Sequence, residues 1–323
     1  MKILRSLDHL PDPFRRGALA VGNFDGVHLG HARILERLAA NARRVGGPAV
    51  VLTFDPHPVQ ILRPQLAPPP LTQTDRKAQL LARWGVDAVI AYPTDAAFLT
   101  HTARQFFDEI VCARLGARAL VEGANFFFGH DRQGTIDVLR RFCAEAAVEL
   151  EVVEPVVLQG EVVSSSRIRA LLAQGEVDLA RRMLTEPYRI RGTVVHGAGR
   201  GASLGFPTAN LTGVRTLLPA QGIYAGRAAA DGSIWSAAIS LGPNPTFDEG
   251  GLKIEAHLID YRGTLYDRPL EVDFLARLRD VERFASADQL VAQMREDVAA
   301  TKAILASGGT EARKTDWVQS NGC

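Results

Sequence analysis

The feature of this sequence that most limits its fold is a change of pattern near Pro187. Before it, continuous apolar runs alternate with segments of helical spacing. After it come short segments of alternating or β-branched character, separated by turn residues. The first pattern predicts a parallel sheet with helices on both faces, and the second predicts a small barrel or sandwich. A chain of 323 residues is also long enough for about two domains.

In the first half, the order of strands and helices places the polar clusters. The predicted strands are Ala18 to Phe24, Pro48 to Phe54, Asp87 to Tyr92, Ala117 to Val121 and Leu150 to Val157. Helical spacing covers His28 to Ala42, Thr74 to Trp84, Thr102 to Leu115 and Thr135 to Ala147. Ligands of open parallel sheets bind at the carboxyl ends of the strands. Here those ends carry the Gly, His and Asp residues.

The second half is preceded by a helical stretch from Ser166 to Leu184 that Gly175 interrupts. The predicted strands are Tyr188 to His196, Gly222 to Ala229, Ser233 to Leu241, Ile254 to Tyr261 and Leu270 to Leu275. A helix from Ala287 to Leu305 closes this half, with a capping box predicted at its start. Residues 307–323 are polar, contain glycine and are expected to be disordered.

Composition excludes several classes of protein. The 37 basic and 36 acidic residues leave a net charge of +1, whereas a broad nucleic-acid surface needs a basic excess. Three widely spaced cysteines, Cys112, Cys143 and Cys323, make neither a disulfide framework nor a zinc site. The N-terminus lacks the apolar core of a signal peptide, and no run reaches the roughly 18 apolar residues of a membrane span. We therefore expect a cytoplasmic protein with no nucleic-acid or membrane partner; its oligomeric state is not encoded in these patterns.

The string from Gly22 to His31 follows a predicted strand and opens a predicted helix. Glycines let the main chain approach a phosphate, and the free N–H groups at a helix start point toward it. His28 and His31 are three residues apart and share one side of the first turn. Two imidazoles there can stabilise charge on a phosphorus under attack. Either histidine alone is better explained as part of a helix cap, but the pair behind a glycine-rich strand end favours phosphate.

These residues resemble the His-x-Gly-His signature of the nucleotidyltransferase superfamily. That signature alone leaves open other members, such as pantetheine-phosphate, nicotinamide and glycerol-phosphate nucleotidyltransferases and class I aminoacyl-tRNA synthetases. The fuller string Gly-x-Phe-Asp-Gly-Val-His-x-Gly-His resembles the FMN adenylyltransferase half of bacterial bifunctional riboflavin kinase/FAD synthetases. The resemblance implies catalytic roles for His28 and His31. The other ATP contacts that it implies are Gly22, Phe24, Asp25, Gly26 and Gly30.

The segment from Ser164 to Arg169 resembles that family's Ser-Ser-Thr-x-Ile-Arg, with Ser166 in the Thr position. Short hydroxyl side chains at a helix start bond a phosphate or cap the helix. Arg169 would bring a fixed positive charge to the triphosphate. The resemblance therefore implies ATP contacts at Ser164, Ser165 and Ser166 and a catalytic role for Arg169. By itself the segment is better explained as an N-cap followed by a surface arginine.

Two segments resemble the family's flavin-contacting regions. The strand-end sequence from Thr53 to Pro58 implies flavin contacts at Phe54 and Pro56. The segment from Asn125 to Gly129 implies a flavin contact at Asn125. Here the chain departs from the family, because Phe127 occupies a position that is often Arg. The departure puts a phosphate contact in doubt unless Arg132 or another base supplies it.

The string from Gly192 to Leu211 contains a second chemical cluster. Dense glycine around one arginine suits a loop that covers a phosphate, although a bare glycine-rich loop is more often a turn. Its Gly-Phe-Pro-Thr-Ala-Asn segment resembles the riboflavin kinase signature, which implies that Thr208 and Asn210 organise ATP and Mg²⁺. Neutral oxygen ligands suit Mg²⁺. The implied ATP contacts are Gly199, Arg200, Gly201, Gly205, Thr208 and Asn210.

Glu255 lies in a strand-like Lys-Ile-Glu-Ala-His-Leu segment. Spacing alone favours a solvated strand face. The segment resembles the kinase family's Glu-x-His-Leu, which implies that Glu255 is the base that takes a proton from the substrate hydroxyl. Two departures, Ala202 in the glycine-rich loop and Ser240 where the family usually has Asn, leave the implied base and metal ligands in place.

Taken together, the resemblance implies an α/β chain with a Rossmann-like nucleotidyltransferase domain over residues 1–184. A small antiparallel β-barrel with a terminal helix, the riboflavin kinase domain, would cover residues 185–306. The implied enzyme uses Mg²⁺ and ATP to phosphorylate riboflavin to FMN and then adenylylates FMN to FAD, releasing pyrophosphate. Two alternatives stay open: an enzyme that retains one of the two activities, or a regulator that binds flavin and nucleotide without turnover.

Overall fold

The structure, a computed structural model, describes residues 1–8, 10–244, 246 and 249–307. The chain forms two compact units. The first contains Met1–Leu172, Leu179–Tyr188 and Arg215–Leu217, and the second contains Ala173–Asp178, Arg189–Val214 and the residues from Leu218 onward. None of the helices in these described ranges has the length and hydropathy needed to cross a membrane. The tail predicted to be disordered covers residues 307–323; its first residue, Ser307, ends the last helix, and the rest, Cys323 included, lies outside the described residues.

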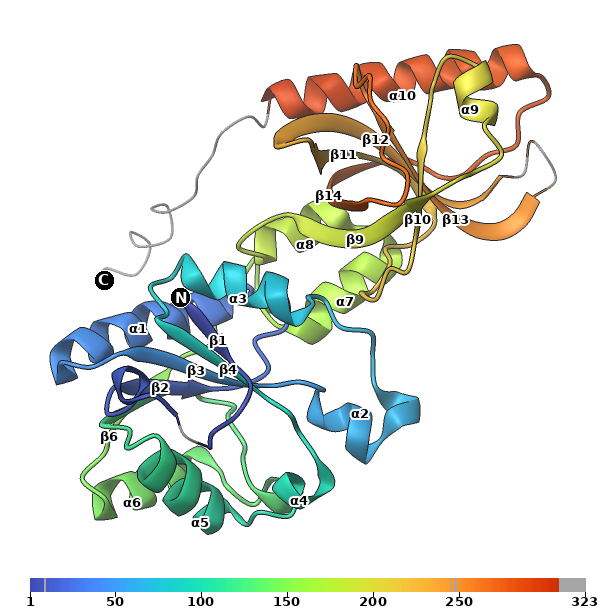
Figure 1. Cartoon of the computed structure of the whole chain (residues 1–323). Coiled ribbons are helices and arrows are strands. Elements are labelled where there is room, and N and C mark those ends of the chain that lie inside the picture. Colours follow the sequence, from blue (N-terminus) through green and yellow to red (C-terminus); the bar gives the residue numbers. More distant parts are fainter. Residues whose placement is uncertain (9, 245, 247–248, 308–323) are drawn as a thin grey trace. The chain divides into compact units, whose positions relative to one another are not determined.

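A six-stranded sheet forms the centre of the first unit, in the order β1-β4-β3-β2-β5-β6 (Figure 1). All its strand pairs are parallel, as the alternation of apolar runs and helices predicts. The strands are β1 (Lys2–Leu4), β2 (Ala18–Val21), β3 (Ala49–Phe54), β4 (Ala88–Tyr92), β5 (Ala119–Gly123) and β6 (Glu149–Val153). The carboxyl ends of neighbouring β2, β3 and β5 therefore meet at one edge.

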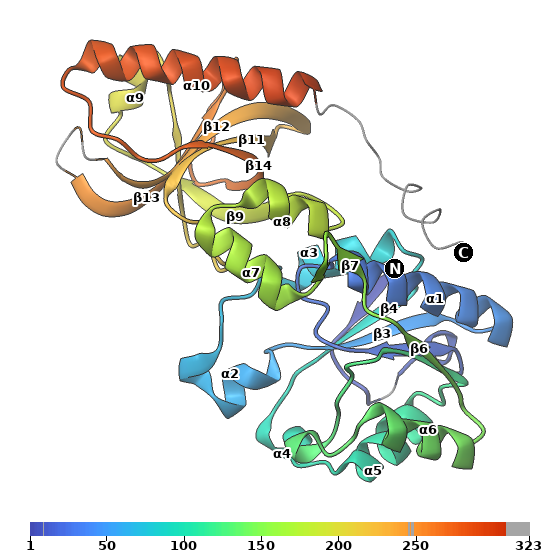
Figure 2. The ribbon, with the colours of Figure 1, turned by 180° about the vertical axis from the view of Figure 1, so that it is seen from behind.

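Helices cover both faces of this sheet (Figures 1 and 2). On one face, α1 (Leu29–Val45) and α3 (Thr74–Ala82) pack on side chains of β2, β3, β4 and β5. On the other face, a phenylalanine-rich cluster joins the sheet to the remaining helices. These are α4 (Ala96–Leu99), α5 (Ala103–Gln105), the π-helix η3 (Phe106–Arg114) and α6 (Ile136–Glu145). Alternate residues of each strand enter opposite cores, which is why the strand sequences are apolar throughout.

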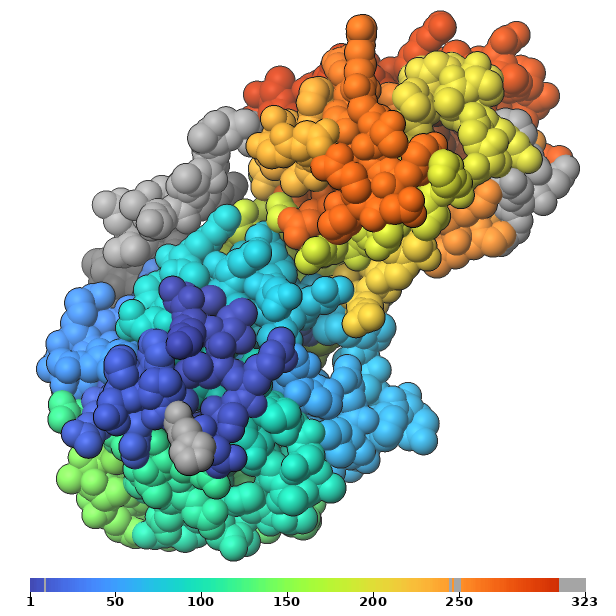
Figure 3. Space-filling model, viewed as in Figure 1, coloured from blue at the N-terminus to red at the C-terminus, as the bar shows by residue number. Residues whose placement is uncertain are grey.

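The first unit differs from the sequence prediction in two places. Strand β1 was not predicted, because three exposed or half-buried residues at a sheet edge carry no apolar pattern. The N-terminal part of the chain, dark blue in Figure 3, lies at the surface. The predicted helix from Thr102 to Leu115 forms, but most of it has π-type hydrogen bonds, such as that from the N–H of Leu115 to the carbonyl of Ile110. Apolar spacing does not distinguish these two hydrogen-bond patterns.

The second unit is a closed antiparallel barrel in the order β10-β13-β12-β11-β14-β9. Its strands are β9 (Tyr188–Val195), β10 (Ala209–Thr212), β11 (Gly222–Ala230), β12 (Ser233–Asn244), β13 (Glu249–Leu258) and β14 (Pro269–Arg279). Tyr224 and Phe274 meet edge to face inside it, with ring centroids 5.3 Å apart. The long helix α10 (Ala287–Ser307) packs against β11, β12 and β14. The barrel and the terminal helix confirm the predicted architecture.

Gly226 allows strand β11 to bend tightly enough to close the barrel. Two register shifts between β11 and β14 precede this residue, the second of them directly before it, and such bulges increase local twist. A Cβ atom at Gly226 would lie 2.2 Å from the carbonyl oxygen of Asp273 and 2.4 Å from the side chain of Ile239. Only glycine lets the two strands and the core side chain approach this closely.

Several short elements connect these parts. They are η1 (Asp12–Phe14), α2 (Pro58–Leu62), η2 (Pro64–Leu66), η4 (His130–Arg132), β7 (Val157–Leu158), β8 (Glu161–Val162), α7 (Ser165–Gln174), α8 (Val177–Met183) and α9 (Arg200–Ser203). The helical break predicted at Gly175 is confirmed: α7 ends one residue before it, and Gly175 has a left-handed backbone with φ of 82°. Neither α9 nor the four-residue strand β10 was predicted.

Candidate functional site

The first candidate site begins where β2 ends and α1 starts. His28 is the N-cap of α1, and its Nδ1 accepts a hydrogen bond from the main-chain N–H of His31 at 3.3 Å. The two imidazole rings are stacked, with centroids 3.6 Å apart and an angle of 17° between planes. A Cβ atom at Gly30 would lie 3.1 Å from Cε1 of His28. Glycine at this position therefore gives the ring room.

Burial keeps both histidines neutral in the folded protein. It lowers the pKa of His28 to about 4, although the nearby Asp25 carboxylate acts in the opposite direction. The pKa of His31 is lowered by burial and, further, by the charges of His28 and Lys77. Nδ1 of His31 is buried and has no hydrogen-bond partner in the described part of the chain. A neutral imidazole offers one N–H donor, so this pair can hold a phosphate oxygen through hydrogen bonds.

The buried His28 makes the stability of the first unit sensitive to acid. The unfolded side chain binds a proton below its ordinary pKa of 6.5, whereas the folded one binds it only near pH 4. The free energy of unfolding should therefore fall between pH 6.5 and pH 4, by about 3 kcal/mol for this residue. Urea unfolding of wild type and His28→Asn at pH 7.0 and pH 4.5 measures the effect. The free energy of unfolding is expected to fall less in the variant than in the wild type between these two pH values. Equal decreases would contradict the prediction.

Asp25 organises the loop that precedes α1. Its buried carboxylate accepts hydrogen bonds from the main-chain N–H groups of Leu71 and Thr72 at 2.9 to 3.0 Å and from the Thr72 hydroxyl at 3.1 Å. It also accepts one from Nη2 of Arg169. Arg169, expected to face a triphosphate, is thus neutralised by Asp25. The pair joins three segments that are far apart in sequence.

The hydroxyl groups at the start of α7 also have partners. Ser164 Oγ accepts a hydrogen bond from the N–H of Arg167 at 3.2 Å, which makes Ser164 the cap of α7. Ser165 Oγ donates to the main-chain oxygen of Asp25 at 2.8 Å. The structure therefore brings the Ser164 to Arg169 segment next to the glycine loop, and the Ser165 hydroxyl, a predicted phosphate contact, helps to hold the two segments together.

The predicted flavin contacts lie at the ends of neighbouring parallel strands. Phe54 ends β3 and packs in the phenylalanine cluster, with its ring 5.7 Å from that of Phe98. Asn125 is exposed just after β5. Phe127 is 44% exposed, and the guanidinium of Arg132 lies 4.2 Å above the centre of its ring. Arg132 is therefore close to the position where the family often has an arginine.

Sequence reasoning missed a cation in the first site. Lys77 of α3 is buried, and its Nζ donates to Oγ1 of Thr53 at 3.3 Å. Thr53 Oγ1 in turn donates to the main-chain oxygen of Asn23, in the glycine loop, at 3.1 Å. A lysine on an apolar helix face was the available signal, because lysine is seldom fully buried without a partner. Phe24, predicted to contact ATP, is buried and packs in the core on this face of the sheet.

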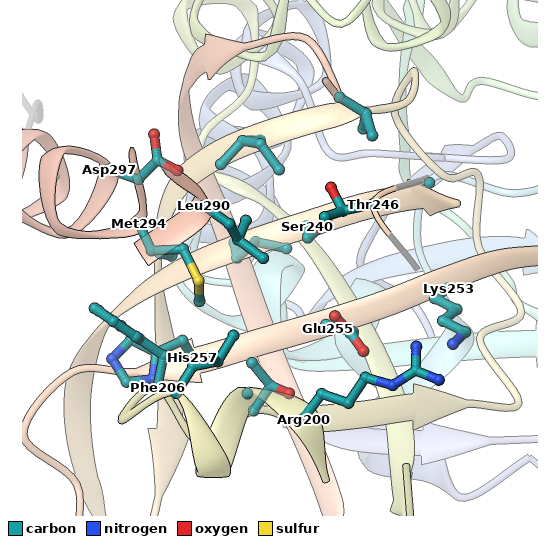
Figure 4. Close-up of a pocket in the computed structure, with 18 of the residues that line it drawn as sticks. Arg200, Phe206, Ser240, Thr246, Lys253, Glu255, His257, Leu290, Met294 and Asp297 are labelled. Carbon is teal, nitrogen blue, oxygen red and sulfur yellow. The ribbon is translucent and has the colours of Figure 1, made fainter. Parts of the chain in front are cut away.

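The second candidate site is a cavity between one side of the barrel, α9 and α10 (Figure 4). Asn210 of β10 and Glu255 of β13 are register partners. Side chains directly opposite on neighbouring strands share a face and are about 5 Å apart at Cβ. Thr208, two residues before Asn210, also lines the cavity. The structure thus brings together the predicted base and the two predicted Mg²⁺ ligands.

Strand β13 contributes three polar side chains to the cavity. Lys253, Glu255 and His257 alternate with residues of the opposite face, among which Ala256 is fully buried. The ring of His257 contacts the carbonyl of Pro207 through Nδ1 at 2.8 Å and thereby holds the segment before Thr208. Neither Lys253 nor His257 was identified as a site residue from the sequence, since alternation along a strand does not reveal which face lines a cavity.

The glycine-rich loop forms another wall. Arg200, the first residue of α9, points toward the strand that carries Glu255 and Lys253 (Figure 4). Gly199 and Gly205, which flank this helical turn, have left-handed backbones with φ of 71° and 87°. A Cβ atom at Gly197 would lie 2.3 Å from the amide nitrogen of Asn210. Glycine is favoured at positions 199 and 205 by the left-handed backbone and at position 197 by the close approach to Asn210.

Helix α10 supplies the apolar wall. Leu290 and Met294 face the cavity (Figure 4). One turn further on, buried Asp297 accepts hydrogen bonds from Nε and Nη2 of Arg279 at 3.0 and 2.8 Å. This ion pair fixes the helix to β14. The sequence did not reveal this ion pair, because an aspartate on a helix usually faces solvent.

Replacing Asp297 with alanine is expected to destabilise the second unit by about 3 kcal/mol, because it leaves the Arg279 guanidinium without its carboxylate. The matched control is Glu296→Ala, which removes an exposed carboxylate from the neighbouring position of the same helix. Urea unfolding followed by circular dichroism measures both variants. If the two variants unfold alike, the ion pair does not hold the helix.

Comparison with known proteins gives matches over both units. A family model described as FAD synthetase matches residues 11–167, and one described as Riboflavin kinase matches residues 184–305. The bifunctional riboflavin kinase/FMN adenylyltransferase of Pseudomonas fluorescens is 38% identical over 308 residues, covering 95% of this chain and 98% of the relative. The protein of the same description from Escherichia coli (strain K12) is 33% identical over 299 residues, covering 92% of this chain and 96% of the relative.

A solved structure also resembles the chain. The crystal structure of a Streptococcus pneumoniae protein described as a macrolide-efflux protein has a TM-score of 0.83 and 31% sequence identity. The match covers 93% of this chain and 98% of that protein.

Proposed function

The chain belongs to the family of bifunctional riboflavin kinase/FMN adenylyltransferases, and we propose how its two units carry out the two reactions. It is an enzyme that phosphorylates riboflavin to FMN and adenylylates FMN to FAD, with ATP as the co-substrate of both steps. The kinase reaction is assigned to a domain of residues 185–306 and the adenylyl transfer to a domain of residues 1–184. We propose that the enzyme acts in the cytoplasm.

In the kinase reaction, Glu255 accepts the proton of the terminal ribityl hydroxyl of riboflavin as that oxygen attacks the γ-phosphorus of ATP. Thr208 and Asn210 would hold Mg²⁺ together with the phosphates of ATP. Arg200 and the glycines around it cover the phosphate chain, while Leu290 and Met294 contact the flavin ring. The observation that carries this assignment is the register pair of Asn210 and Glu255 in one cavity.

The side chains at this end of the cavity fit an Mg²⁺ ion that binds as its complex with ATP. Thr208 and Asn210 offer neutral oxygens beside the Glu255 carboxylate. Across the described ranges, no group of three or more His, Cys, Asp or Glu side chains is arranged to hold a metal ion. The phosphates of ATP and water are therefore expected to complete the coordination, as is usual for Mg²⁺ at phosphoryl-transfer sites. The ion supplies charge neutralisation of the phosphates when it is bound.

In the adenylyl transfer, a phosphate oxygen of FMN attacks the α-phosphorus of ATP and pyrophosphate leaves. The nucleophile is already an anion, so no base is required. His28 and His31 donate hydrogen bonds to the phosphorus-bound oxygens and stabilise their growing charge. Arg169 is held by its ion pair with Asp25, in the loop that precedes α1. Asn125, Phe54 and Pro56 are the proposed flavin contacts.

The test is a time course with purified protein, riboflavin, ATP and Mg²⁺, followed by chromatography of the flavins. FMN appearing first and FAD following would support both site assignments, and a chelator in excess of Mg²⁺ should stop both. FMN without FAD would contradict the proposed first site and direct attention to Phe127. Riboflavin that stays bound and unconverted would favour the regulator.

A further inference from the structure

The first unit contains a lysine that no step of the proposed mechanism uses. Lys77 extends from α3 to the carboxyl end of β3 and is only 6% exposed. Its Nζ donates a hydrogen bond to Thr53 Oγ1 at 3.3 Å, and Thr53 is fully buried at the end of that strand. Burial of an ammonium group is unfavourable unless charged or strong hydrogen-bond partners compensate it. A neutral hydroxyl at this distance compensates little of that cost.

The nearby carboxylates are engaged elsewhere. Burial lowers the pKa of Lys77, and Asp25 and Asp55 partly oppose that effect. Asp25, however, is occupied by Arg169 and by the segment that contains Thr72. Asp55 accepts a hydrogen bond from Thr74 at 2.7 Å and lies 3.5 Å from Arg5. Among the described residues, no carboxylate is within the 4.0 Å salt-bridge distance of Lys77.

The surroundings of Lys77 are those of the predicted phosphate site. Its hydroxyl partner Thr53 also bonds the glycine loop at Asn23. The side-chain oxygen of Asn23 and Nδ1 of His31 are buried polar atoms that lack hydrogen-bond partners within the described residues. Lys77 is close enough for its charge to lower the pKa of His31 and of His57. A buried cation near an imidazole nitrogen that can carry a proton, and that lacks a partner among the described residues, indicates an anionic ligand.

We propose that Lys77 is a catalytic residue of the adenylyl transfer and binds a non-bridging oxygen of the ATP triphosphate. This proposal rests on the proposed function of the first unit. As the FMN phosphate oxygen bonds to the α-phosphorus, the bond from that phosphorus to the α–β bridging oxygen breaks. Its electron pair leaves with pyrophosphate, and no proton moves from the lysine. The compact ammonium neutralises the charge that accumulates on the leaving group.

Lys77 differs from the neighbouring basic residues in carrying a charge that is not balanced by an ion pair among the described residues. His28 and His31 are neutral when buried, and the positive charge of Arg169 is balanced by Asp25. Lys77 therefore supplies a positive charge that the protein itself does not balance at contact distance. A structural lysine would instead have an ion-pair partner in the folded chain.

The decisive variant is Lys77→Met, because methionine keeps the length and packing of the side chain. FAD formation from supplied FMN and ATP should fall about 10²- to 10³-fold, while FMN formation from riboflavin stays unchanged. The affinity for pyrophosphate, titrated calorimetrically in the presence of Mg²⁺, should fall at least tenfold. The melting temperature should hold or rise, because a poorly paired buried charge is replaced by an apolar group. Arg83→Met is the matched control. It also removes a cation, one that follows the same helix directly and is paired with Glu186.

Each outcome separates this proposal from the function on which it rests. If the wild-type protein makes no FAD, the assignment of adenylyl transfer to the first unit is wrong. If wild type makes FAD and Lys77→Met makes it equally fast, the catalytic role of Lys77 is wrong. A drop in melting temperature with unchanged pyrophosphate affinity would show a structural role and overturn the proposal. Should Lys77→Met fail to fold, Lys77→Gln can be used, because it keeps a hydrogen-bond donor for Thr53. It allows the same comparison of FAD with FMN formation, and of pyrophosphate affinity with melting temperature.

Discussion

Replacing Glu255 with glutamine should reduce the formation of FMN from riboflavin by about 10²- to 10⁴-fold, the range typical of a lost general base. Glutamine keeps the size and hydrogen-bonding capacity of the side chain on β13 but accepts no proton. The binding of ATP should change little, because the side chains of Thr208 and Asn210 stay in place. Initial rates measured with saturating riboflavin and Mg²⁺-ATP test this expectation.

Two controls make the result specific. The same Glu255→Gln protein, supplied with FMN and ATP, should form FAD at the wild-type rate, because that reaction belongs to the other unit. Glu271→Gln neutralises a carboxylate of the same barrel that does not line the cavity and pairs with Arg189; it should leave FMN formation within a few-fold of wild type. Normal FMN formation by Glu255→Gln would assign the base elsewhere, and His257 would be the next candidate.

Much of the fold could be predicted because its determinants are local. The strands of the parallel sheet are buried on both faces, so each is a continuous apolar run in the sequence. The barrel strands show turn residues at short, regular intervals. Strand β10 escaped prediction because its four residues follow the glycine-rich loop directly and are too few to show alternation. Its place in the barrel is set by pairing with β9 and β13, which are distant in sequence.

The same distinction applies to the sites. His28 and His31 were recognisable because three-residue spacing at a helix start is a local pattern. The pair of Asp25 and Arg169 was not, because the two residues are separated by most of the first unit's sequence and each resembles an ordinary charged residue. Lys77 and Asp297 were missed for a related reason. A charged residue on a helix is usually solvated, and only the folded chain shows that these two are buried.

The second large effect is expected from the stacked histidines. His31→Ala should reduce FAD formation from FMN and ATP by about 10²- to 10³-fold, the usual effect of removing one preorganised donor to a developing anion. FMN formation from riboflavin should not change. For His28, asparagine is the better replacement, since it can keep the N-cap hydrogen bond to His31 and thus the helix start. Chromatographic rates of FMN and FAD formation from one preparation measure both reactions.

His101→Gln is the matched control for these variants, because that histidine packs against Phe98 in the opposite core of the same unit. It should leave both reactions unchanged. Because the rings of His28 and His31 are stacked and act on one phosphorus, the double variant should lose less than the product of the two single effects. Multiplicative losses would mean that the histidines act on separate groups of the substrates. Equal loss of FMN and FAD formation in His31→Ala would contradict the assignment of adenylyl transfer to this site.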